Sequence, residues 1–365
     1  MDRPTRVNLA LGSGGARGYA HLGVLQVLDE RGIEVVGVAG SSMGALVGAV
    51  LAAGRVDEYT EWVLGLTQLD VVRLADLKLS APGAIRADKV LARVRDLLDD
   101  ACIEDLPIPY TAVATDLLAR KEVWFQRGPI VTAIRASIAI PGVITPVMHN
   151  GRLLVDGGVM DPVPIAPTAA VRADATIAVS LGGDPRGAPA GGHVQDTAAD
   201  EPVDDGPGRL RRSATNLRDR DAVRALLGRF GGGLEHAVDV DALAGELAPE
   251  GGEDDHDPAQ DRSGGEDVFE ALPAGLGKLD VMNQSLEVMQ SVLTRYRLAG
   301  FPPDVLISVP RDACRSLDFH RAAEMIALGR TLAEEALDRS GIPGLAGRAE
   351  PPGPPDPGDA PTDDA

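Results

Sequence analysis

The stretch that decides the fold is Val35-Val36-Gly37-Val38-Ala39-Gly40-Ser41-Ser42-Met43-Gly44-Ala45-Leu46-Val47-Gly48. An apolar run typical of a buried strand meets a Gly-x-Ser-x-Gly sequence, and a run of small residues typical of a helix follows directly. This context predicts a nucleophile elbow, a tight turn from strand to helix that presents a serine hydroxyl. Ser42 is the central serine. Gly40 and Gly44 flank it because side chains there would collide with the strand and the helix.

The composition indicates a globular protein with an aliphatic core. The chain has 365 residues, of which 44% are hydrophobic but only 3% are aromatic, so the core must be built from Leu, Val, Ile and Ala. Cys102 and Cys314 are far apart in the sequence and favour a reducing compartment over a disulfide framework. The six histidines form no His-x-x-x-His pair, and we therefore expect neither a metal nor a cofactor.

The charge and the N-terminus limit the partners and the location. The net charge of −20 argues against nucleic-acid binding, and much of the acidic excess falls in residues 184–270. The N-terminal residues lack the pattern of a signal peptide, and no apolar run reaches the length of a membrane-spanning helix. We therefore expect a cytoplasmic protein. The sequence predicts no particular oligomeric state.

Short apolar runs alternate with helical patterns along most of the chain. The predicted strands cover residues 7–11, 35–39, 110–116, 122–126, 152–155, 175–181 and 304–309. The predicted helices cover residues 19–31, 42–53, 57–66, 88–99, 129–137 and 317–340. Such alternation predicts a three-layer α/β fold, with a central, largely parallel sheet flanked by helices.

This alternation is interrupted in the second half of the chain. We expect one α/β domain from residues 1–182 and 275–342, an acidic, mostly disordered insertion at 183–274, and a disordered tail at 343–365. Within the insertion, residues 209–230 combine seven arginines with apolar residues at helical spacing. They predict a basic amphipathic helix, which is either solvated or lies on a membrane as a peripheral contact.

A long helix with one apolar stripe is predicted after residue 276. The residues of the stripe recur every three or four positions and are Leu279, Met282, Leu286, Met289, Leu293 and Tyr296. We interpret this stripe as core packing, with a seam for a partner as the alternative.

A glycine-rich loop, Gly12-Ser13-Gly14-Gly15-Ala16-Arg17-Gly18, lies between the first strand and the first helix. Its backbone N–H groups and the positive end of the helix dipole can hold an oxyanion, with Gly14 and Gly15 as the favoured donors. Arg17 either has a structural role, in which it pairs with a carboxylate, or helps the oxyanion loop by bracing it or by supplying positive charge. A dinucleotide site would require glycine in its place. His21, one turn into the helix, is interpreted as a packing or hydrogen-bonding residue.

A serine nucleophile also requires a base. His149 and His320 lie downstream of Ser42, but neither has a context typical of a catalytic triad. Asp156 follows a predicted strand and precedes two glycines, so its carboxylate would lie at a strand end, where α/β sheets bind their ligands. Asp-Gly-Gly is also a common turn sequence, and the alternative is that it has no catalytic role. Ser137 is interpreted as a hydrogen-bonding residue at a helix end.

Three of these elements, in this order, resemble the patatin-like phospholipase family: the Gly-x-Gly-Gly-x-Arg-Gly loop, the Gly-x-Ser-x-Gly elbow and the Asp-Gly-Gly turn. Residues 136–142, which read Ala-Ser-Ile-Ala-Ile-Pro-Gly, and the pair Pro146-Val147 are similar to the segment that precedes the aspartate in that family. Residues 112–116, 302–304 and 317–322 resemble its bacterial RssA-type members. The resemblance covers about residues 1–182 and 275–340.

The resemblance implies a Ser–Asp dyad without histidine, in which Ser42 is the nucleophile and Asp156 is the base. It implies an oxyanion hole in the loop that contains Gly12, Gly14, Gly15, Ala16, Arg17 and Gly18. The motif glycines of the elbow and the turn are Gly40, Gly44, Gly157 and Gly158. An aspartate with the ordinary pKa of about 3.9 is a weak base. Burial must therefore raise the pKa of Asp156 for efficient proton transfer.

The implied substrates are acyl esters of lipids, such as phospholipids, lysophospholipids or simpler carboxylic esters, cleaved through an acyl-enzyme. The alternative is a regulatory protein that binds an acyl chain or a protein partner with slow or no turnover. A lipid substrate also makes peripheral contact at the inner membrane face an alternative to a purely cytoplasmic location.

Overall fold

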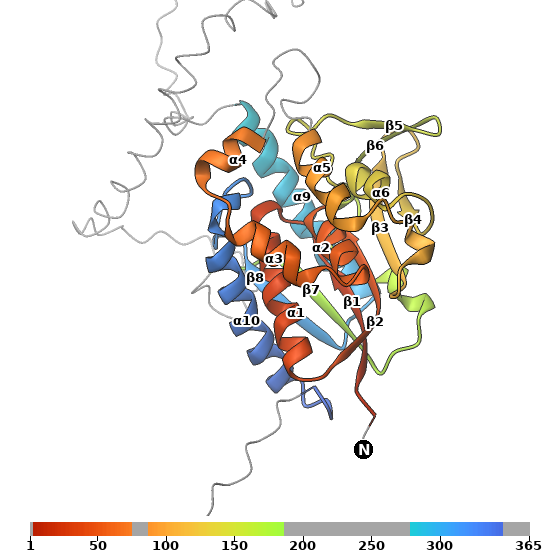
Figure 1. Cartoon of the computed structure of the whole chain (residues 1–365), viewed down its shortest axis with the longest axis vertical. Coiled ribbons are helices and arrows are strands. Elements are labelled where there is room, and N and C mark those ends of the chain that lie inside the picture. The colour runs from red at the N-terminus through yellow and green to blue at the C-terminus, as the bar shows by residue number, and fades with distance from the viewer. Residues whose placement is uncertain (1–2, 75–86, 186–277, 346–365) are drawn as a thin grey trace, which may run out of the picture. The chain divides into compact units, whose positions relative to one another are not determined.

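The computed structural model describes residues 3–74, 87–185 and 278–345 (Figure 1). The predicted insertion at 183–274, including the helix expected at 209–230, and the predicted tail at 343–365 lie outside the described residues except at their edges. The described part of the chain contains no helix with the length and hydrophobicity needed to cross a bilayer.

The described residues form one eight-stranded sheet in the order β5-β6-β3-β2-β1-β7-β8, with β4 paired to β3. The strands are β1 (Arg6–Leu11), β2 (Glu34–Ser41), β3 (Tyr110–Asp116), β4 (Lys121–Phe125), β5 (Val147–His149), β6 (Arg152–Asp156), β7 (Ala175–Gly183) and β8 (Val305–Pro310). The strands β3, β2, β1, β7 and β8 run parallel, whereas β4, β5 and β6 form antiparallel pairs at one end. The predicted, largely parallel sheet is therefore confirmed.

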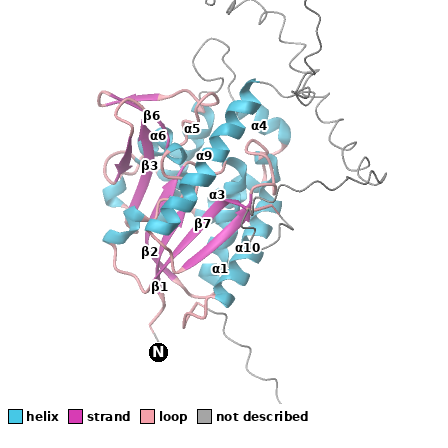
Figure 2. Cartoon of the chain, turned by 180° about the vertical axis from the view of Figure 1, so that it is seen from behind, coloured by secondary structure: helices cyan, strands magenta, loops and turns pink. Residues whose placement is uncertain are grey.

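Helices cover both faces of this sheet. They are α1 (Ala20–Glu30), α2 (Met43–Ala52), α3 (Val56–Leu64), α4 (Gln68–Leu74), α5 (Asp88–Leu98), α6 (Ile130–Ser137), α9 (Lys278–Gly300) and α10 (Ala322–Arg339). Figures 1 and 2 show α1, α2 and α10 on one side of the strands and α9 on the other. The central strands are buried on both sides, and every residue of β3 is buried. The three-layer α/β arrangement is confirmed.

The pairing of β3 brings two strand ends together. On one edge β4 pairs with residues 112–116 of β3. The other edge is shared, because β2 pairs with residues 110–113 and β6 continues with residues 114–116. Since β2 runs parallel to β3 and β6 runs antiparallel to it, the carboxyl ends of β2 and β6 point toward each other. Ser41 lies opposite Val113, and Asp156 lies opposite Ala114.

The apolar stripe of α9 is on the opposite side from the one predicted. Met282, Met289 and Tyr296, which the sequence assigned to the core, are 40%, 55% and 74% exposed. The helix instead turns a polar side toward the sheet, where Glu287 pairs with the buried Arg17. Leu286 and Leu293, the other two stripe residues whose side chains are described, are half-buried. None of the five is buried, so the interpretation as core packing is wrong. Helical periodicity reveals that a stripe exists but not which way it faces.

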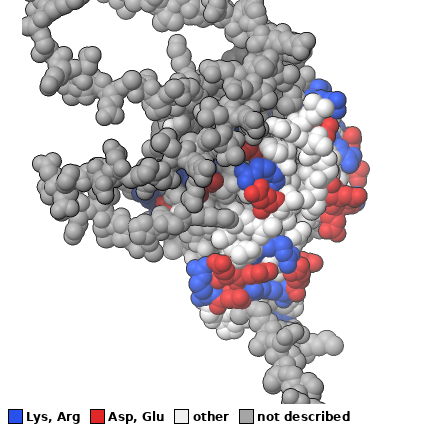
Figure 3. All heavy atoms as spheres, turned by 90° about the vertical axis from the view of Figure 1, so that its left-hand side faces the viewer, with Lys and Arg blue, Asp and Glu red and all other residues white. Residues whose placement is uncertain are grey.

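The charge of the described surface is mixed. On the face seen in Figure 3, basic and acidic side chains lie side by side, and no large area of one sign occurs among the described residues there. Some of these charges form ion pairs between helices. Arg330 of α10 pairs with Glu30 of α1, and Asp338 of α10 pairs with Arg31, the residue that follows α1. The formal excess of negative charge therefore does not mark this face as a binding site.

Candidate active site

Ser42 adopts the strained backbone expected of a nucleophile elbow. It lies between β2 and α2 with φ 57° and ψ −121°, a conformation that costs of order 1–3 kcal/mol for a residue with a side chain. A Cβ atom at Gly40 would lie 2.2 Å from the carbonyl oxygen of Gly44, and one at Gly44 would lie 2.1 Å from that of Leu11. Both motif glycines are therefore required by close backbone approach.

Two neighbouring hydroxyls hold the elbow in place. The Ser42 N–H donates to Ser137 Oγ at 2.9 Å, and Ser137 Oγ donates to the Val113 carbonyl at 2.6 Å. The adjacent Ser41 donates its hydroxyl to the Asp161 carbonyl at 2.6 Å and is fully buried. The Ser41 hydroxyl is thus used in a structural hydrogen bond. Ser137 lies at the end of α6, as predicted, but its contacts are to the elbow and to β3.

Asp156 ends β6 with one carboxylate oxygen occupied and the other without a regular partner. Asp156 Oδ1 accepts from the Gly158 N–H at 2.7 Å, and the Asp156 N–H donates to the Ala139 carbonyl at 2.9 Å. Oδ2 is buried and has no hydrogen bond of normal length and angle among the described residues. The Ser42 hydroxyl is nevertheless close enough to lower the pKa of this carboxyl.

The environment of Asp156 makes it a stronger base than an ordinary aspartate. The residue is only 3% exposed, as is Ser42. Burial raises the pKa of Asp156 to about 7, although the Ser42 side chain and the Gly158 N–H act in the opposite direction. This is the direction that proton transfer from a serine hydroxyl requires.

In the glycine-rich loop, some backbone N–H groups are used by the fold and others are not. The N–H groups of Gly12, Ser13 and Ala16 donate to the carbonyls of Val179, Pro162 and Ser316 at 2.8–2.9 Å. Those of Gly14 and Gly15 have no acceptor among the described residues. Gly15 has φ +58°, and a Cβ there would lie 2.3 Å from the Ser316 carbonyl oxygen, so only glycine fits.

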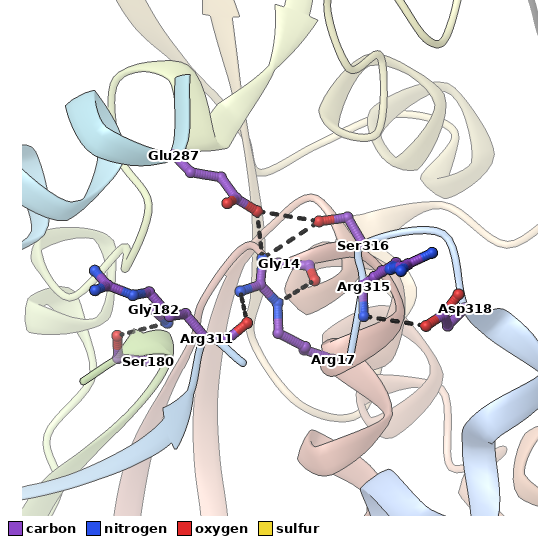
Figure 4. Close-up of polar contacts among 9 residues, drawn as sticks. All are labelled: Gly14, Arg17, Ser180, Gly182, Glu287, Arg311, Arg315, Ser316 and Asp318. Atoms are coloured by element: carbon purple, nitrogen blue, oxygen red, sulfur yellow. Dashed lines mark hydrogen bonds and ion pairs between the residues drawn. The ribbon is translucent and has the colours of Figure 1, made fainter. Parts of the chain in front are cut away.

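Arg17 contacts this loop and also pairs with a carboxylate, as its structural interpretation predicts. Its guanidinium donates to the carbonyl oxygens of Gly14 and Arg311 at 3.2 and 2.9 Å, and it pairs with Glu287 of α9 at 2.9 Å (Figure 4). The side chain is almost fully buried. Arg17 thereby holds the carbonyl oxygen of Gly14, while the N–H of the same peptide, which belongs to Gly15, has no acceptor among the described residues.

The three histidines that the sequence singled out lie in different settings. His21 is fully buried, and burial lowers its pKa to about 4, against the effect of the Gly12 carbonyl. Its neutral ring donates from Nε2 to that carbonyl at 2.9 Å, which is the structural role predicted for it. His149 lies on β5 with its ring centroid 5.8 Å from that of Phe125. His320 lies in the short helical turn before α10.

A cavity of about 310 Å³ lies beside the loop, under the polar side of α9. Its wall includes Ser13 and Arg17 from the loop, the end of β7, and Glu287 and Gln290 from α9. Neither Ser42 nor Asp156 lines it. A Cβ at Gly158 would nevertheless lie 2.4 Å from Ser13 Oγ and 2.9 Å from Gln290 Nε2, so the cavity borders the turn that follows Asp156.

The mostly parallel sheet with helices on both faces defines an α/β protein, in which a Gly-x-Ser-x-Gly turn ends a central strand. The chain belongs to the patatin-like phospholipase family, whose model matches residues 9–169. It is 52% identical over 337 residues to an uncharacterized NTE family protein of Mycobacterium tuberculosis, and the match covers 91% of each chain. It is also 32% identical over 183 residues to the patatin-like phospholipase domain-containing protein 6 of Mus musculus, covering 48% of this chain and 13% of that protein.

Among solved structures, the chain is similar to VipD from Legionella pneumophila, with a TM-score of 0.39 and 16% identity. That match covers 66% of this chain and 58% of the other. Membership of the patatin-like phospholipase family supports a lipid hydrolase activity.

The motifs alone did not predict two hydrogen bonds that position Ser42 and Asp156. Ser137 accepts from the Ser42 N–H, and the Ala139 carbonyl accepts from the Asp156 N–H, so one short segment holds both residues. The sequence signal was the resemblance of residues 136–142 to the family. That resemblance identified the segment without indicating its contacts.

Proposed function

We propose that this protein is a serine hydrolase that cleaves acyl esters of phospholipids or lysophospholipids through a Ser42–Asp156 dyad. The observation that supports the proposal most directly is the Asp156 carboxyl itself. It is buried beside the Ser42 hydroxyl, its pKa is raised to about 7, and Oδ2 has no other hydrogen bond among the described residues. A buried carboxylate oxygen without a partner is costly unless the site uses it.

In the first step, Ser42 Oγ attacks the acyl carbonyl carbon and passes its proton to Asp156 Oδ2. The N–H groups of Gly14 and Gly15 stabilise the oxyanion of the tetrahedral intermediate. Asp156 then returns the proton to the leaving alcohol oxygen as the bond to the acyl carbon breaks. The acyl group remains on Ser42 as an ester.

In the second step, Asp156 takes a proton from a water molecule that attacks the acyl-enzyme. Collapse of the second intermediate returns the proton to Ser42 Oγ and releases the fatty acid. Gly12 and Ala16, also proposed for the oxyanion hole, have N–H groups engaged with Val179 and Ser316. Their contribution is therefore to shape the loop.

A fluorophosphonate probe tests the nucleophile, with the adjacent serine as a matched control. We expect wild type and Ser41→Ala to be labelled and Ser42→Ala to be unlabelled, because Ser41 donates its hydroxyl to a backbone carbonyl. Esterase activity should follow the same order. A folded wild-type protein that is neither labelled nor active would instead favour the regulatory function, in which the fold binds an acyl chain or a partner without turnover.

A further inference from the structure

Helix α9 presents its apolar side to solvent. Six of its large apolar side chains are 40–74% exposed, and they recur at helical spacing along the whole helix: Val281, Met282, Val288, Met289, Val292 and Tyr296. Residues three and four positions apart lie on the same face of a helix. These six side chains therefore lie on one side of the helix, in a strip interrupted by the exposed Ser285, which we call the α9 outer face. Figure 2 shows α9 on the outside of the sheet, on the side opposite α1 and α10.

The opposite side of α9 is mostly polar and faces the protein. Gln284, Glu287, Gln290, Ser291 and Thr294 line the cavity beside the glycine-rich loop, and Val288, at the edge of the outer face, borders it as well. Leu298, nearer the end of the helix, packs against the buried cluster that contains Ala10 and Ala178. A surface helix of a globular protein normally has the reverse orientation, with its apolar stripe toward the core.

Three ion pairs prevent α9 from rolling over to bury this strip. Glu287 pairs with the buried Arg17 at 2.9 Å. Near the other end, Arg297 pairs with Glu122 of β4 and lies 3.9 Å from Asp161, which is 1% exposed. Rolling the helix would separate these charges. Asp161 would then be buried without an ion-pair partner, and Arg17 would lose its carboxylate and keep only its neutral partners, the carbonyls of Gly14 and Arg311 and the Ser316 hydroxyl. The outward orientation is therefore fixed by the fold.

We propose that the α9 outer face docks on a lipid surface. The inference rests on the proposed function, because a phospholipase must take its substrate from a bilayer or micelle. The inner side of the same helix borders the candidate site, where Gln290 approaches Gly158, two residues beyond Asp156. A lipid surface in contact with α9 would thus lie against the element that covers the loop and the turn.

The chemistry of the strip and its border fits a phospholipid surface. Aliphatic, methionine and tyrosine side chains suit the boundary between headgroups and acyl chains. Arg295 is exposed next to the strip and forms no ion pair with a described residue. An arginine at this position can approach lipid phosphates, although the chain as a whole carries a net charge of −20.

The size of the strip argues against a second copy of the chain as its occupant. The strip runs from Val281 to Tyr296, which at the rise of an α-helix is about 24 Å, and a face about 10 Å wide then offers on the order of 240 Å². A stable dimer buries roughly 800 Å² on each partner. A lipid surface requires no matching shape and can be reached by one amphipathic helix.

Vesicle binding tests the proposal. The variants are Met289→Asp and Tyr296→Asp, singly and together, and the control is Leu64→Asp. Leu64 is 50% exposed on α3, on the other side of the sheet. Cosedimentation with vesicles of phosphatidylcholine and phosphatidylglycerol in equal parts measures the partition coefficient. Unchanged thermal unfolding would show that the variants are folded.

We expect the double variant to bind vesicles at least tenfold more weakly than wild type, and Leu64→Asp to bind within twofold of wild type. Equal losses in the double variant and in Leu64→Asp would overturn the proposal, as would absence of vesicle binding by wild type. So would a wild-type dimer that the double variant converts to a monomer while vesicle binding persists.

The catalytic proposal can fail independently of this one. Ser42→Ala should bind vesicles as wild type does while losing hydrolysis of a water-soluble ester. A wild-type protein that binds vesicles through the α9 outer face but is not labelled by the fluorophosphonate would retain the docking proposal and refute the catalytic one.

Discussion

At the scale of single residues, the proposed reaction depends on the protonation state of Asp156. Its pKa of about 7 means that much of the carboxyl is protonated in mildly acidic solution. A protonated carboxyl cannot accept the Ser42 proton, so kcat/KM on a soluble ester should rise with pH, with an apparent pKa near 7, and level off above about pH 8. A pH–rate profile between pH 5 and 9 measures this. Asp156→Asn should lose at least about a hundredfold in kcat.

Asp161 is the matched control for this profile. Burial also raises its pKa to about 7, but its carboxylate oxygens have no hydrogen-bond partner among the described residues, and Arg297 lies 3.9 Å away. Asp161→Asn should therefore leave the apparent pKa of the activity in place. A profile that shifts with Asp161→Asn, or that stays flat in wild type, would contradict the assignment of Asp156 as base.

Helix α6 illustrates how an element supports the site. Its last residue, Ser137, is the acceptor for the Ser42 N–H and the donor to Val113 of β3. Removing this hydroxyl leaves two buried backbone groups without partners, which costs about 1–3 kcal/mol. If part of that cost falls on the geometry of the elbow, kcat falls by about tenfold or more while KM changes little.

Steady-state kinetics of Ser137→Ala measure this effect, and Thr132→Ala on the same helix is the control. Thr132 lies one turn earlier and has no hydrogen bond from its side chain to a described residue. An unchanged kcat in Ser137→Ala would mean that the strained conformation of Ser42 is held by the turn alone. An equal loss in Thr132→Ala would attribute the effect to the stability of α6.

The sequence predicts a strand well where both faces of that strand are buried, because such a strand is a continuous apolar run. The strand expected at 110–116 is β3 itself, and the expected strand at 35–39 lies within β2. The structure adds β5 and α4, which are short and partly exposed, so their sequences carry no continuous apolar signal. The orientation of α9 could not be predicted, because its apolar stripe has the same period whether it faces the core or solvent.

At the scale of the molecule, the sequence predicts the two motifs that contain Ser42 and Asp156, but it does not predict that the fold brings them close together. Gly-x-Ser-x-Gly and Asp-Gly-Gly each follow a strand, and that much is local. Their approach depends on β2 and β6 sharing one edge of β3 from opposite directions. Such pairing is set by contacts between distant segments, which neither propensity nor periodicity reports. The resemblance to a family supplied the pairing of Ser42 with Asp156 that local patterns left open.

The stability of the whole molecule should depend on pH in an unusual direction. Asp156 and Asp161 have pKa values of about 7 in the folded protein, compared with 3.8 for a free aspartate. The folded state therefore binds their protons more tightly than the unfolded state does, and stability increases as the pH falls from 7 toward 4. His21 acts the other way, because its pKa is lowered from 6.5 to about 4 by burial.

Two carboxyls against one imidazole leave a net uptake of about one proton on folding between pH 6.5 and 5.5. The free energy of unfolding should then rise by about 1.4 kcal/mol for each unit that the pH falls in this range. Below that range the uptake shrinks, because hydrogen bonds lower the pKa values of Glu30, Asp70, Glu104 and Asp174 in the folded protein. Thermal unfolding in buffers from pH 8 to pH 5 should show a rising Tm. The double variant Asp156→Asn with Asp161→Asn keeps His21 but lacks both carboxyls. Its Tm should therefore decrease as the pH is lowered, opposite to wild type. A double variant with the wild-type dependence would show that the two aspartates are ionised in the folded protein, and Asp156 would then be too weak a base for the role proposed here.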